Sequence, residues 1–414
     1  MNRRAFLSAA TAGTVMTACQ DPPPAAPHSP DPIDTLVNRT RSLDPIPAEE
    51  LHNRIARLQG HLATSQAGSY LVEAGSSLEY FTGIRWGRSE RLFAAVIPRT
   101  GDPVLICPGF EEARAQQQDR LGLQLRVWQE HEDPVALLAG ALQDANPGPV
   151  VVEPTTRWWI IDRLRQLRPA LEIQDGTQAT DSCRLRKSPV ELERIRLANS
   201  LTRDAFRTAL AGVWEGMTES QLAERISRAF RRMGVRGGAL VLFGPNSALP
   251  HGSAVDRQLR LGDIILMDGG CSVSGYVADV TRSVIFGEPS GLQADLWRIV
   301  HRAQQEAIEA VRPGITAGEL DDIARRIIAE AGYGPDYTYF THRLGHGIGL
   351  DGHEPPYLVR GNSQVLEPGM VFSVEPGIYL PGQFGIRHED NVVVTEQGFE
   401  VLGEPLSEDA IRLG

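Results

Sequence analysis

Residues 259–270 read LRLGDIILMDGG, and residues 366–377 read LEPGMVFSVEPG. The two stretches match at a leucine and two glycines over a constant offset of 107 residues, and Asp268 in the first falls on Glu375 in the second. In both, a carboxylate follows a short apolar run of the kind that forms a buried strand. A purely structural repeat would not need an acid at that point, so the pattern predicts duplicated strands that bring chemistry to one place.

A second pair of segments extends the repeat. Residues 213–224, VWEGMTESQLAE, and residues 311–322, VRPGITAGELDD, share Val, Gly, Thr and Leu at an offset of 98 residues. Each contains a Thr-x-x-Gln/Glu capping box, the signature of a helix start. Two matching segments in the same order predict two duplicated halves, each a helix followed by strands.

Asp268 and Asp279 lie on either side of a turn signal at Ser274-Gly275. A hairpin that turns there sets the two acids opposite each other or within one register step. Directly opposed residues have Cβ atoms about 4.5–5.5 Å apart. The first hairpin is therefore predicted to carry two facing carboxylates.

The second copy repeats this arrangement, with Glu375 before a Pro381-Gly382 turn and Glu389 on the return strand. Facing carboxylates repel each other and burial raises the cost of their charge, so either one acid of each pair is protonated or a cation neutralises them. The cation is favoured because a fifth candidate ligand is present. This is His346 in THRLGHGIGLDGHEPP, where the flanking glycines let the backbone approach another group closely.

Alone, such a histidine is more often a hydrogen-bonded core residue, but beside two acidic hairpins we interpret it as a ligand. Four carboxylates and one imidazole suit a pair of divalent ions with a bridging water, manganese first and cobalt, iron or zinc as alternatives. Cys271 follows Asp268 by three residues, but strand alternation does not aim it at this site, and we interpret it as a packing residue.

Composition excludes several classes of protein. The 414 residues include 41 Lys and Arg against 52 Asp and Glu, a formal net charge of −11 without a basic run, which argues against nucleic-acid binding. No stretch reaches the roughly 18 apolar residues of a membrane-spanning helix. Four cysteines are too few for a disulfide scaffold.

The chain is predicted to form two domains. Residues 48–182 alternate helical and short strand patterns, which indicates an α/β domain; it shows no cluster of catalytic residue types, so we assign it a packing or oligomerisation role. A capping box from Ser188 to Glu191, with proline at the first helical position, then opens a helix to about Ala211. Residues 183–414 form the second domain, of α+β class with an internal pseudo-two-fold repeat.

The first residues are typical of an export signal. Residues 1–18 begin with Arg3 and Arg4 and resemble a twin-arginine signal, and Met-Thr-Ala before Cys19 resembles a lipobox. Residues 19–47 would then be a lipidated cysteine and a Pro-rich tether. The alternative is the frayed terminus of a cytosolic protein. We expect a lipoprotein that faces the periplasm or the outside, touches the membrane only through its lipid, and is exported with its cofactor already inserted.

Taken together, GPNSALPHG, ILMDGG, YVADVTRSV, HRLGHGIGLDGHEPP, FSVEPGIY and GIRHEDNVVVT resemble the metallopeptidase family that includes aminopeptidase P, Xaa-Pro dipeptidase (prolidase) and methionine aminopeptidase. The resemblance covers residues from about 183 to 402, and residues 48–180 resemble the creatinase-type N-terminal domain of its proline-specific branch. It implies the pita-bread fold, a homodimer, and peptide substrates with proline at the second position. The metal ligands that it implies are Asp268, Asp279, His346, Glu375 and Glu389.

The resemblance further implies that Asp279 and Glu389 bridge the two ions. His251 and His353 match positions that hydrogen-bond the substrate and stabilise the tetrahedral intermediate. His342 matches a histidine on the proline side of the pocket. Arg387 matches an arginine that orients the bridging glutamate.

The implied reaction is hydrolysis of the bond that precedes proline. Water held between two divalent ions loses a proton near neutral pH and attacks the scissile carbonyl. His353 would stabilise the oxyanion, and Glu375 would carry the proton to the proline nitrogen. The alternatives are a metal-dependent hydrolase or lyase of a small non-peptide C–N substrate, and a peptide-binding scaffold without catalysis; the intact ligand set argues against the scaffold. Methionine aminopeptidase is disfavoured by the extra N-terminal domain and by export.

Overall fold

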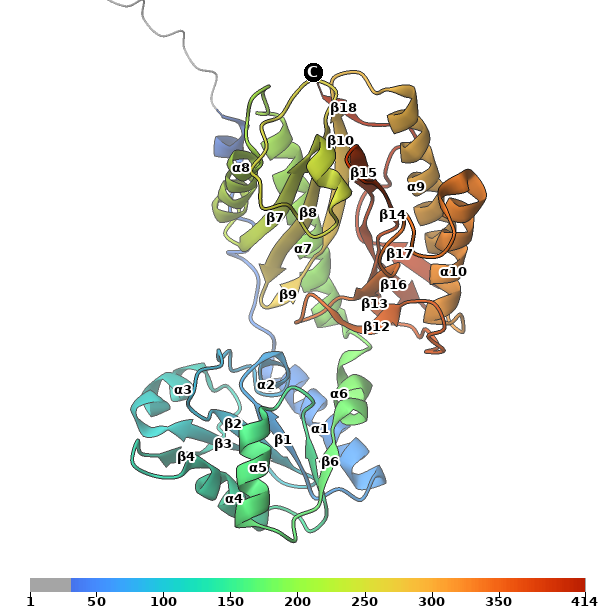
Figure 1. Ribbon diagram of the computed structural model, residues 1–414. Coiled ribbons are helices and arrows are strands. Elements are labelled where there is room, and N and C mark those ends of the chain that lie inside the picture. Colours follow the sequence, from blue (N-terminus) through green and yellow to red (C-terminus); the bar gives the residue numbers. More distant parts are fainter. Residues whose placement is uncertain (1–30, 414) are drawn as a thin grey trace, which may run out of the picture.

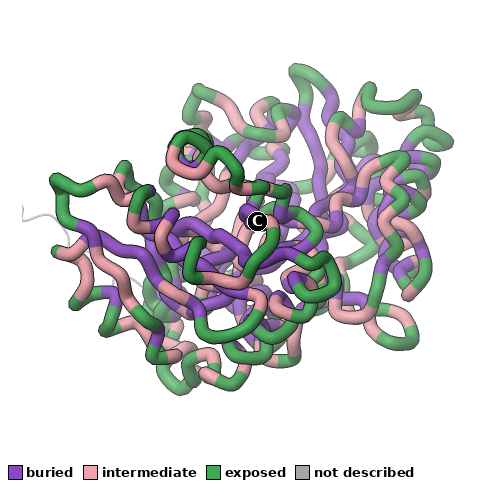
Figure 2. Tube along the Cα trace, turned by 90° about the horizontal axis from the view of Figure 1, so that it is seen from below, coloured by how far each residue is buried: buried purple, intermediate pink, exposed green. Residues whose placement is uncertain are grey.

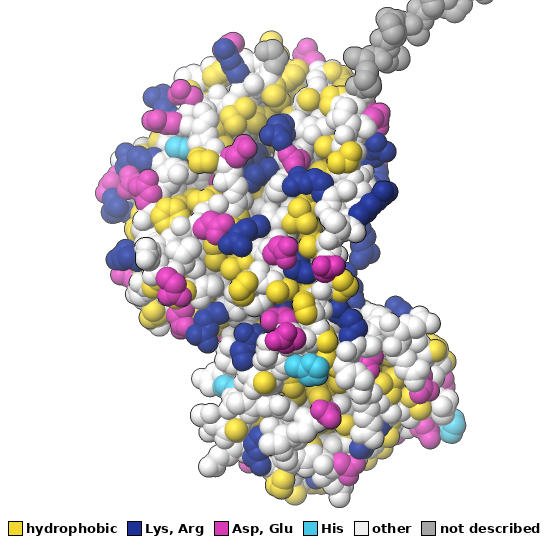
Figure 3. Space-filling view, turned by 180° about the vertical axis from the view of Figure 1, so that it is seen from behind, with side chains coloured by type: hydrophobic (Ala, Val, Ile, Leu, Met, Phe, Trp, Pro, Cys, Tyr) yellow, Lys and Arg dark blue, Asp and Glu magenta, His cyan; other side chains and the backbone are white. Residues whose placement is uncertain are grey.

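The computed structural model describes residues 31–413, which form two lobes (Figure 1). The first domain ends in α6 (Thr177–Arg184), from which the chain passes into the second domain. On the face shown in Figure 3, acidic and basic side chains are interspersed over both lobes. Figure 2 shows that buried segments run through the interior and exposed segments lie at the periphery. Among the described residues, no helix combines the length and the apolar character of a membrane span.

A six-stranded mixed sheet, in the order β4-β3-β2-β1-β5-β6, forms the centre of the first domain. Its strands are β1 (Ser69–Glu73), β2 (Ala94–Pro98), β3 (Val104–Pro108), β4 (Gln124–Trp128), β5 (Val150–Val152) and β6 (Ile173–Asp175). Its other helices are α1 (Ala48–Thr64), α2 (Ser76–Thr82), α3 (Glu112–Gln118), α4 (Pro134–Asp144) and α5 (Trp158–Leu167), with a 3-10 turn η2 (Gly109–Glu111). Tyr70 and Val72 face one apolar cluster and Leu71 the other, so helices cover both faces of the sheet. The predicted α/β architecture is confirmed.

The second domain consists of two related halves. Its helices are α7 (Pro189–Leu210), α8 (Glu219–Arg232), α9 (Gly291–Glu309) and α10 (Ala317–Ile328), with short turns η3 (Gly244–Ala248) and η4 (Ala329–Tyr333). The first half contains the strands β7 (Arg236–Phe243), β8 (Ile264–Val273), β9 (Tyr276–Val277), β10 (Val280–Phe286) and β18 (Arg412–Leu413). The second contains β11 (Gly345–Gly347), β12 (Glu354–Leu358), β13 (Val371–Val374), β14 (Gly377–Leu380), β15 (Phe384–Arg387), β16 (Asp390–Thr395) and β17 (Gly398–Val401). Helix α8 flanks one side of these strands, and α9 and α10 flank the other (Figure 1).

The internal repeat is present at the level of single hydrogen bonds. Thr218 caps α8 and Thr316 caps α10, and both predicted capping boxes are formed. Thr218 bridges to Gln258, and Thr316 bridges to Val365. These four positions are related by the offsets of 98 and 107 residues read from the sequence. The predicted pita-bread duplication is therefore confirmed.

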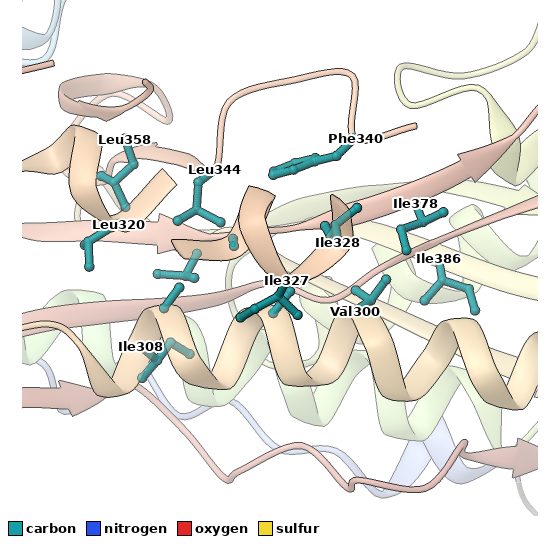
Figure 4. Close-up of a cluster of buried hydrophobic side chains, with 14 of the residues drawn as sticks. Val300, Ile308, Leu320, Ile327, Ile328, Phe340, Leu344, Leu358, Ile378 and Ile386 are labelled. Atoms are coloured by element: carbon teal, nitrogen blue, oxygen red, sulfur yellow. The ribbon is translucent and has the colours of Figure 1, made fainter. Parts of the chain in front are cut away.

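The largest apolar cluster packs the helices of the second half against its strands (Figure 4). Val300 on α9 and Ile327 on α10 are completely buried, as are Leu344 and Ile378 from the sheet side. Each such side chain contributes roughly 1.5–3 kcal/mol when it leaves water. This packing holds the strands that carry the second pair of acids.

The segment that precedes α1 differs from the predicted tether. The short 3-10 helix η1 (Pro32–Thr35) packs on α7 and α8, and Ile33 is completely buried there. The Asp31 side chain accepts hydrogen bonds from Arg225, at 3.0 and 3.1 Å, and from Arg228. Arg39 also donates to Asp204 at 2.6 Å, and the Asp44 carbonyl accepts from Arg194 at 2.7 Å. Residues 31–44 are thus packed on the second domain rather than forming a tether. The predicted export signal, Cys19 and the rest of the tether lie outside the described residues.

Candidate functional site

One cavity of about 460 Å³ in the second domain is lined by every predicted site residue. These nine residues are His251, Asp268, Asp279, His342, His346, His353, Glu375, Arg387 and Glu389. Pro250, Tyr337, Thr341 and Arg343 complete the lining. Residues that are up to 138 positions apart in the sequence therefore converge on one space.

The first acidic hairpin has a register different from the predicted one. Asp268 on β8 pairs with Thr281 on β10, so Asp279 lies two residues beyond the directly opposed position. The cause is a two-residue turn, in which Ser274 (φ 50°) and Gly275 (φ 92°) both have positive φ, as in a type I′ hairpin. A shift of two residues keeps both acids on one face of the hairpin, because side chains alternate with a period of two.

The second hairpin follows the prediction. Val374 pairs with Asp390, and Gly377 pairs with Arg387, so Glu375 and its partner across the hairpin lie directly opposite each other between two ladders. That partner, Glu389, donates its backbone N–H to the carbonyl of Thr281 on β10 at 3.2 Å. This bond brings the second hairpin against the first.

We call Asp268, Asp279, Glu375 and Glu389 the acid cluster. Carboxylate oxygens of Asp268, Asp279 and Glu389 lie within 4.8 Å of one another. Ligand atoms of His346, Glu375 and Glu389 form a second group of this size, and those of Asp279, His346 and His353 a third. The groups overlap, so the cluster is one continuous set of potential ligands.

The electrostatics of the acid cluster fit bound cations. Burial and the neighbouring Asp268 raise the pKa of Asp279 to about 8. Burial also raises the pKa of Glu375 to about 8, and the other acids add to this effect. Burial and the same neighbours hold the pKa of Glu389 well above its usual range, and its buried Oε1 has no hydrogen-bond partner. Among residues 31–413, Arg387 is the only Lys or Arg that forms a salt bridge with the cluster. Oxygen-rich sets with one imidazole suit divalent ions, so the residues present fit the predicted metal pair.

His346 has the geometry of a neutral ligand. Its Nδ1 lies 3.2 Å from the Gly347 carbonyl, which assigns the proton to Nδ1 and leaves Nε2 with a free lone pair. Nε2 lies 3.3 Å from Glu375 and 3.8 Å from Asp279. Burial and the adjacent His353 lower the pKa of His346 to about 4. A Cβ on Gly345 would lie 1.9 Å from the Ser373 carbonyl, so the close backbone approach expected beside His346 is present.

Arg387 contacts Asp268 directly and is connected to Glu389 through the Thr281 hydroxyl. Its guanidinium donates hydrogen bonds to Asp268, to the Thr281 hydroxyl at 3.1 Å and to the Tyr379 hydroxyl at 2.9 Å. It reaches Glu389 only through Thr281, whose hydroxyl lies 2.7 Å from Glu389 Oε2. The predicted role of Arg387 in orienting Glu389 would therefore act through Thr281, because the hairpin register sets Asp268 and Thr281 next to the guanidinium.

The other histidines line the same cavity. His342 Nε2 lies 2.7 Å from the Tyr379 hydroxyl, and burial together with Arg387 lowers the pKa of His342 to about 3. His251 and His353 are exposed at the cavity surface, and the His353 ring lies 3.8 Å from that of His346.

Three residues of this network were not singled out from the sequence. Thr281 could have been found from the hairpin register, as the partner of Asp268. Tyr379 connects His342 to Arg387, and burial raises its pKa to about 12. The Arg343 guanidinium lies 4.3 Å from the centre of the Tyr357 ring and 3.4 Å from His353 Nδ1. No local pattern distinguishes the last two residues.

The cysteines have structural roles. The described cysteines, Cys107, Cys183 and Cys271, are free and buried. The Sγ atom of Cys271 lies 3.4 Å from the Ala198 carbonyl, and burial raises the pKa of this thiol to about 12. The interpretation of Cys271 as a packing residue is confirmed.

Comparisons with known proteins agree with this geometry. Residues 193–396 match metallopeptidase family M24, and residues 54–186 match the creatinase/prolidase N-terminal domain. An uncharacterized peptidase of Staphylococcus aureus is 36% identical over 355 residues, which cover 84% of this chain and 98% of the relative. The crystal structure of the dipeptidase PepE from Mycobacterium ulcerans superposes with a TM-score of 0.82 at 33% identity, covering 89% of this chain and 99% of that one. That of a prolidase from Thermococcus sibiricus has a TM-score of 0.81 at 32% identity, covering 88% and 99%.

The relatives are matched over nearly their whole length, and both domains are included. The chain therefore belongs to metallopeptidase family M24 and is a peptidase with a creatinase/prolidase-type N-terminal domain.

Proposed function

We propose that this peptidase hydrolyses the bond between an N-terminal residue and a proline at the second position. It would use two divalent ions, manganese in the first instance, held by Asp268, Asp279, His346, Glu375 and Glu389. The observation that carries this proposal is the acid cluster itself, four acids in one cavity with a single paired arginine. The prolidase of Thermococcus sibiricus and the dipeptidase PepE support the substrate class.

Asp279 and Glu389 are suited to a position between two ions. Asp279 and Glu389 each belong to two groups of close ligand atoms, as does His346, and of these three the two acids have the two oxygens with which a side chain could serve both ions. When bound, such ions polarise the scissile carbonyl and lower the pKa of water toward neutrality.

Glu375 is the residue best placed to move the proton. It lines the cavity, and the Ser373 hydroxyl donates a hydrogen bond to its Oε1 at 3.3 Å, which fixes the carboxylate. It would take the proton from the attacking water and deliver it to the proline nitrogen. Delivery matters because the nitrogen of an Xaa-Pro bond carries no hydrogen before cleavage.

The histidines would bind the substrate, and His342 and His353 would do so in their neutral forms. Burial and Arg343 lower the pKa of His353, so a neutral imidazole donates one N–H to the developing oxyanion. His251 would hold the substrate from its own part of the cavity lining, and His342, held by Tyr379, would contact the proline ring.

The test is a substrate panel with metal analysis. Ala-Pro, Ala-Pro-Ala and the matched control Ala-Ala are assayed with Mn²⁺, Co²⁺ and Zn²⁺, and bound metal is counted per chain. We expect metal-dependent turnover of the proline substrates only, with about two ions per chain. Equal rates on Ala-Ala would refute the proline specificity. Absence of stoichiometric metal would point to a scaffold, and turnover of small C–N compounds alone would point to the alternative hydrolase.

Two further parts of the proposal concern assembly and location. We expect a homodimer, which light scattering after gel filtration tests directly. Residues 1–18 would direct export by the twin-arginine route, and lipidation of Cys19 would anchor the mature protein on a membrane facing the periplasm or the outside. Replacement of Cys19 by Ser should release the protein from the membrane fraction.

A further inference from the structure

The loop between β11 and β12 carries His353 to the cavity, and the first domain holds it on both sides. Asp351 Oδ2 accepts hydrogen bonds from the Ser76 hydroxyl at 2.7 Å and from Arg184 Nη2 at 2.8 Å. The same Nη2 atom donates to Glu354 Oε2 at 2.6 Å. One guanidinium nitrogen therefore connects the acid two residues before His353 with the acid one residue after it.

Arg184 is itself well fixed. It is the last residue of α6, nine-tenths of its side chain is buried, and its Nη1 donates to the Ser77 hydroxyl at 3.0 Å. Lys187 Nζ donates to the other oxygen of Glu354 at 2.8 Å. We call Arg184, Lys187, Asp351 and Glu354 the interdomain clamp. It contains two cations and two acids.

Other contacts of the loop near His353 come from the second domain: Arg343 lies 3.4 Å from His353 Nδ1, the His353 ring lies 3.8 Å from that of His346, and the Val277 N–H donates to the Gly349 carbonyl at 3.0 Å. The strand pairing is irregular between His346 and Gly347, immediately before the loop. A Cβ on Gly349 would lie 2.3 Å from Glu354 Oε1, which shows that the loop closes tightly around this carboxylate. His353 also lines a second cavity, of about 240 Å³, together with members of the clamp. Because space lies beside the imidazole there, its position depends on how the loop is held.

We propose that Arg184 is a positioning residue, through which the first domain holds residues 349–354, the loop and the first residue of β12, so that His353 faces the reacting carbonyl. The inference rests on the proposed function, in which His353 stabilises the oxyanion. It gives the first domain a part in catalysis within its own chain, beyond the packing role expected from its sequence. A displacement of about 1 Å at a reacting group can lower a rate by about 100-fold, so a single ion pair can matter this much.

The experiment combines variants at Arg184 and His353 in the manganese-loaded full-length enzyme with Ala-Pro as substrate. Arg184→Gln should lower kcat by about 10- to 100-fold, with KM changed less than about 3-fold and bound metal unchanged. Arg184→Lys should recover part of this loss, because an ammonium keeps the charge but does not reproduce the fork of a guanidinium. Added to His353→Ala, Arg184→Gln should lower kcat by less than about 3-fold further, since both changes remove the same contribution.

Arg54 supplies the matched control. It is also a buried arginine of the first domain that reaches the second, donating to the Tyr276 hydroxyl at 3.0 Å and lying 3.7 Å from Glu191, but it does not touch the loop. Arg54→Gln should lower the thermal stability. In the double variant Arg54→Gln/His353→Ala, the fold-loss in kcat should equal the product of the two single fold-losses. The proposal would be overturned if the kcat losses of Arg184→Gln and His353→Ala also multiplied in their double variant. It would be overturned as well if Arg184→Gln lowered kcat only as much as Arg54→Gln does.

A second measurement does not depend on the substrate. Amide hydrogen exchange of residues 349–354 should speed up in Arg184→Gln and in the milder Ser76→Ala, and should not change in Arg54→Gln. Unchanged exchange in the Arg184 variant would overturn the inference. A wild-type enzyme inactive on every Xaa-Pro substrate would instead refute the proposed function, and the exchange result would still decide whether Arg184 holds the loop.

Discussion

The acid cluster and the interdomain clamp both bury carboxylates, and they stabilise them in opposite ways. In the clamp, the buried Glu354 faces Lys187 and Arg184, and the half-exposed Asp351 faces Arg184. Burial alone would raise the pKa of Glu354, but Lys187 and Arg184 hold it below its usual range. In the acid cluster, four acids share one paired arginine, and burial and mutual repulsion raise the pKa of Glu375 to about 8.

The difference separates a structural use of buried charge from a functional one. A buried acid that finds its counter-charge within the chain holds two elements together. A buried acid that does not find one costs stability until a cation arrives from outside. The two regions should therefore respond differently to the same substitution, to pH and to metal.

The largest expected effect is on turnover, when the acid cluster loses a shared ligand. Asp279→Ala should lower kcat/KM by at least about 1,000-fold, because the ions supply several kcal/mol of transition-state stabilisation. Bound manganese, counted by mass spectrometry, should fall below two ions per chain. Glu400→Ala, which removes an exposed partner of Arg196, is the control and should change neither quantity. A fully active Asp279→Ala enzyme would contradict the site.

The next effect concerns stability, when the clamp loses a carboxylate. Glu354→Gln leaves Arg184 and Lys187 without their shared partner and should lower the free energy of unfolding by roughly 3–5 kcal/mol. Urea denaturation measures it. The control Glu367→Gln removes an exposed partner of Arg186 and should cost less than about 1 kcal/mol. Equal losses in the two variants would show that the clamp is not a buried ion pair.

The third prediction concerns the stability of the metal-free protein, which should fall as the pH rises because the acid cluster then has to bury charge without a cation. Well below about pH 4, Asp279 and Glu375 are protonated in both the folded and the unfolded chain, and their raised pKa values carry no penalty for folding. As the pH rises toward 8, the unfolded chain releases protons that Asp279 and Glu375 still hold, so the metal-free protein loses stability. Mn²⁺ at a fixed concentration of 100 times its Kd at pH 8 should restore about 2.7 kcal/mol at pH 8 and less at pH 5, where protons compete for the same carboxylates. A melting temperature with the same metal response at both pH values would argue against this electrostatic account.

The smallest effect has the opposite sign to that of Glu354→Gln. In chelated protein at pH 8, Glu375→Gln removes one of the mutually repelling acids and should raise the free energy of unfolding by on the order of 1 kcal/mol. With manganese present, the same variant should be less stable than the wild type. Thermal unfolding with and without chelator tests both signs. If Glu375→Gln destabilised the metal-free protein instead, Glu375 would be an acid that stabilises the fold without metal, as Glu354 does.

Sequence reasoning reached the site through local signals. The capping threonines Thr218 and Thr316 and the strand ends at Asp268 and Glu375 are recognisable because each depends on neighbours a few residues away. The order of the motifs then indicated the family, and with it the set of residues that line the cavity. The same reasoning failed for residues 31–44, where the Pro-rich composition masked one buried isoleucine, Ile33.

The chain's own pattern of periodicity, turns and repeated acids thus determined the duplication and the paired acids, since these follow from interactions between near neighbours. The family resemblance, and not the local pattern, added His251, His342, His353 and Arg387. Only the tertiary structure decided that Arg387 holds Asp268, and that Arg184 holds a loop 167 to 170 residues away. The physical reason is that a guanidinium leaves no local trace of the carboxylate that it will neutralise. Its partner is chosen by which surfaces the packed domains bring within 3 Å of each other.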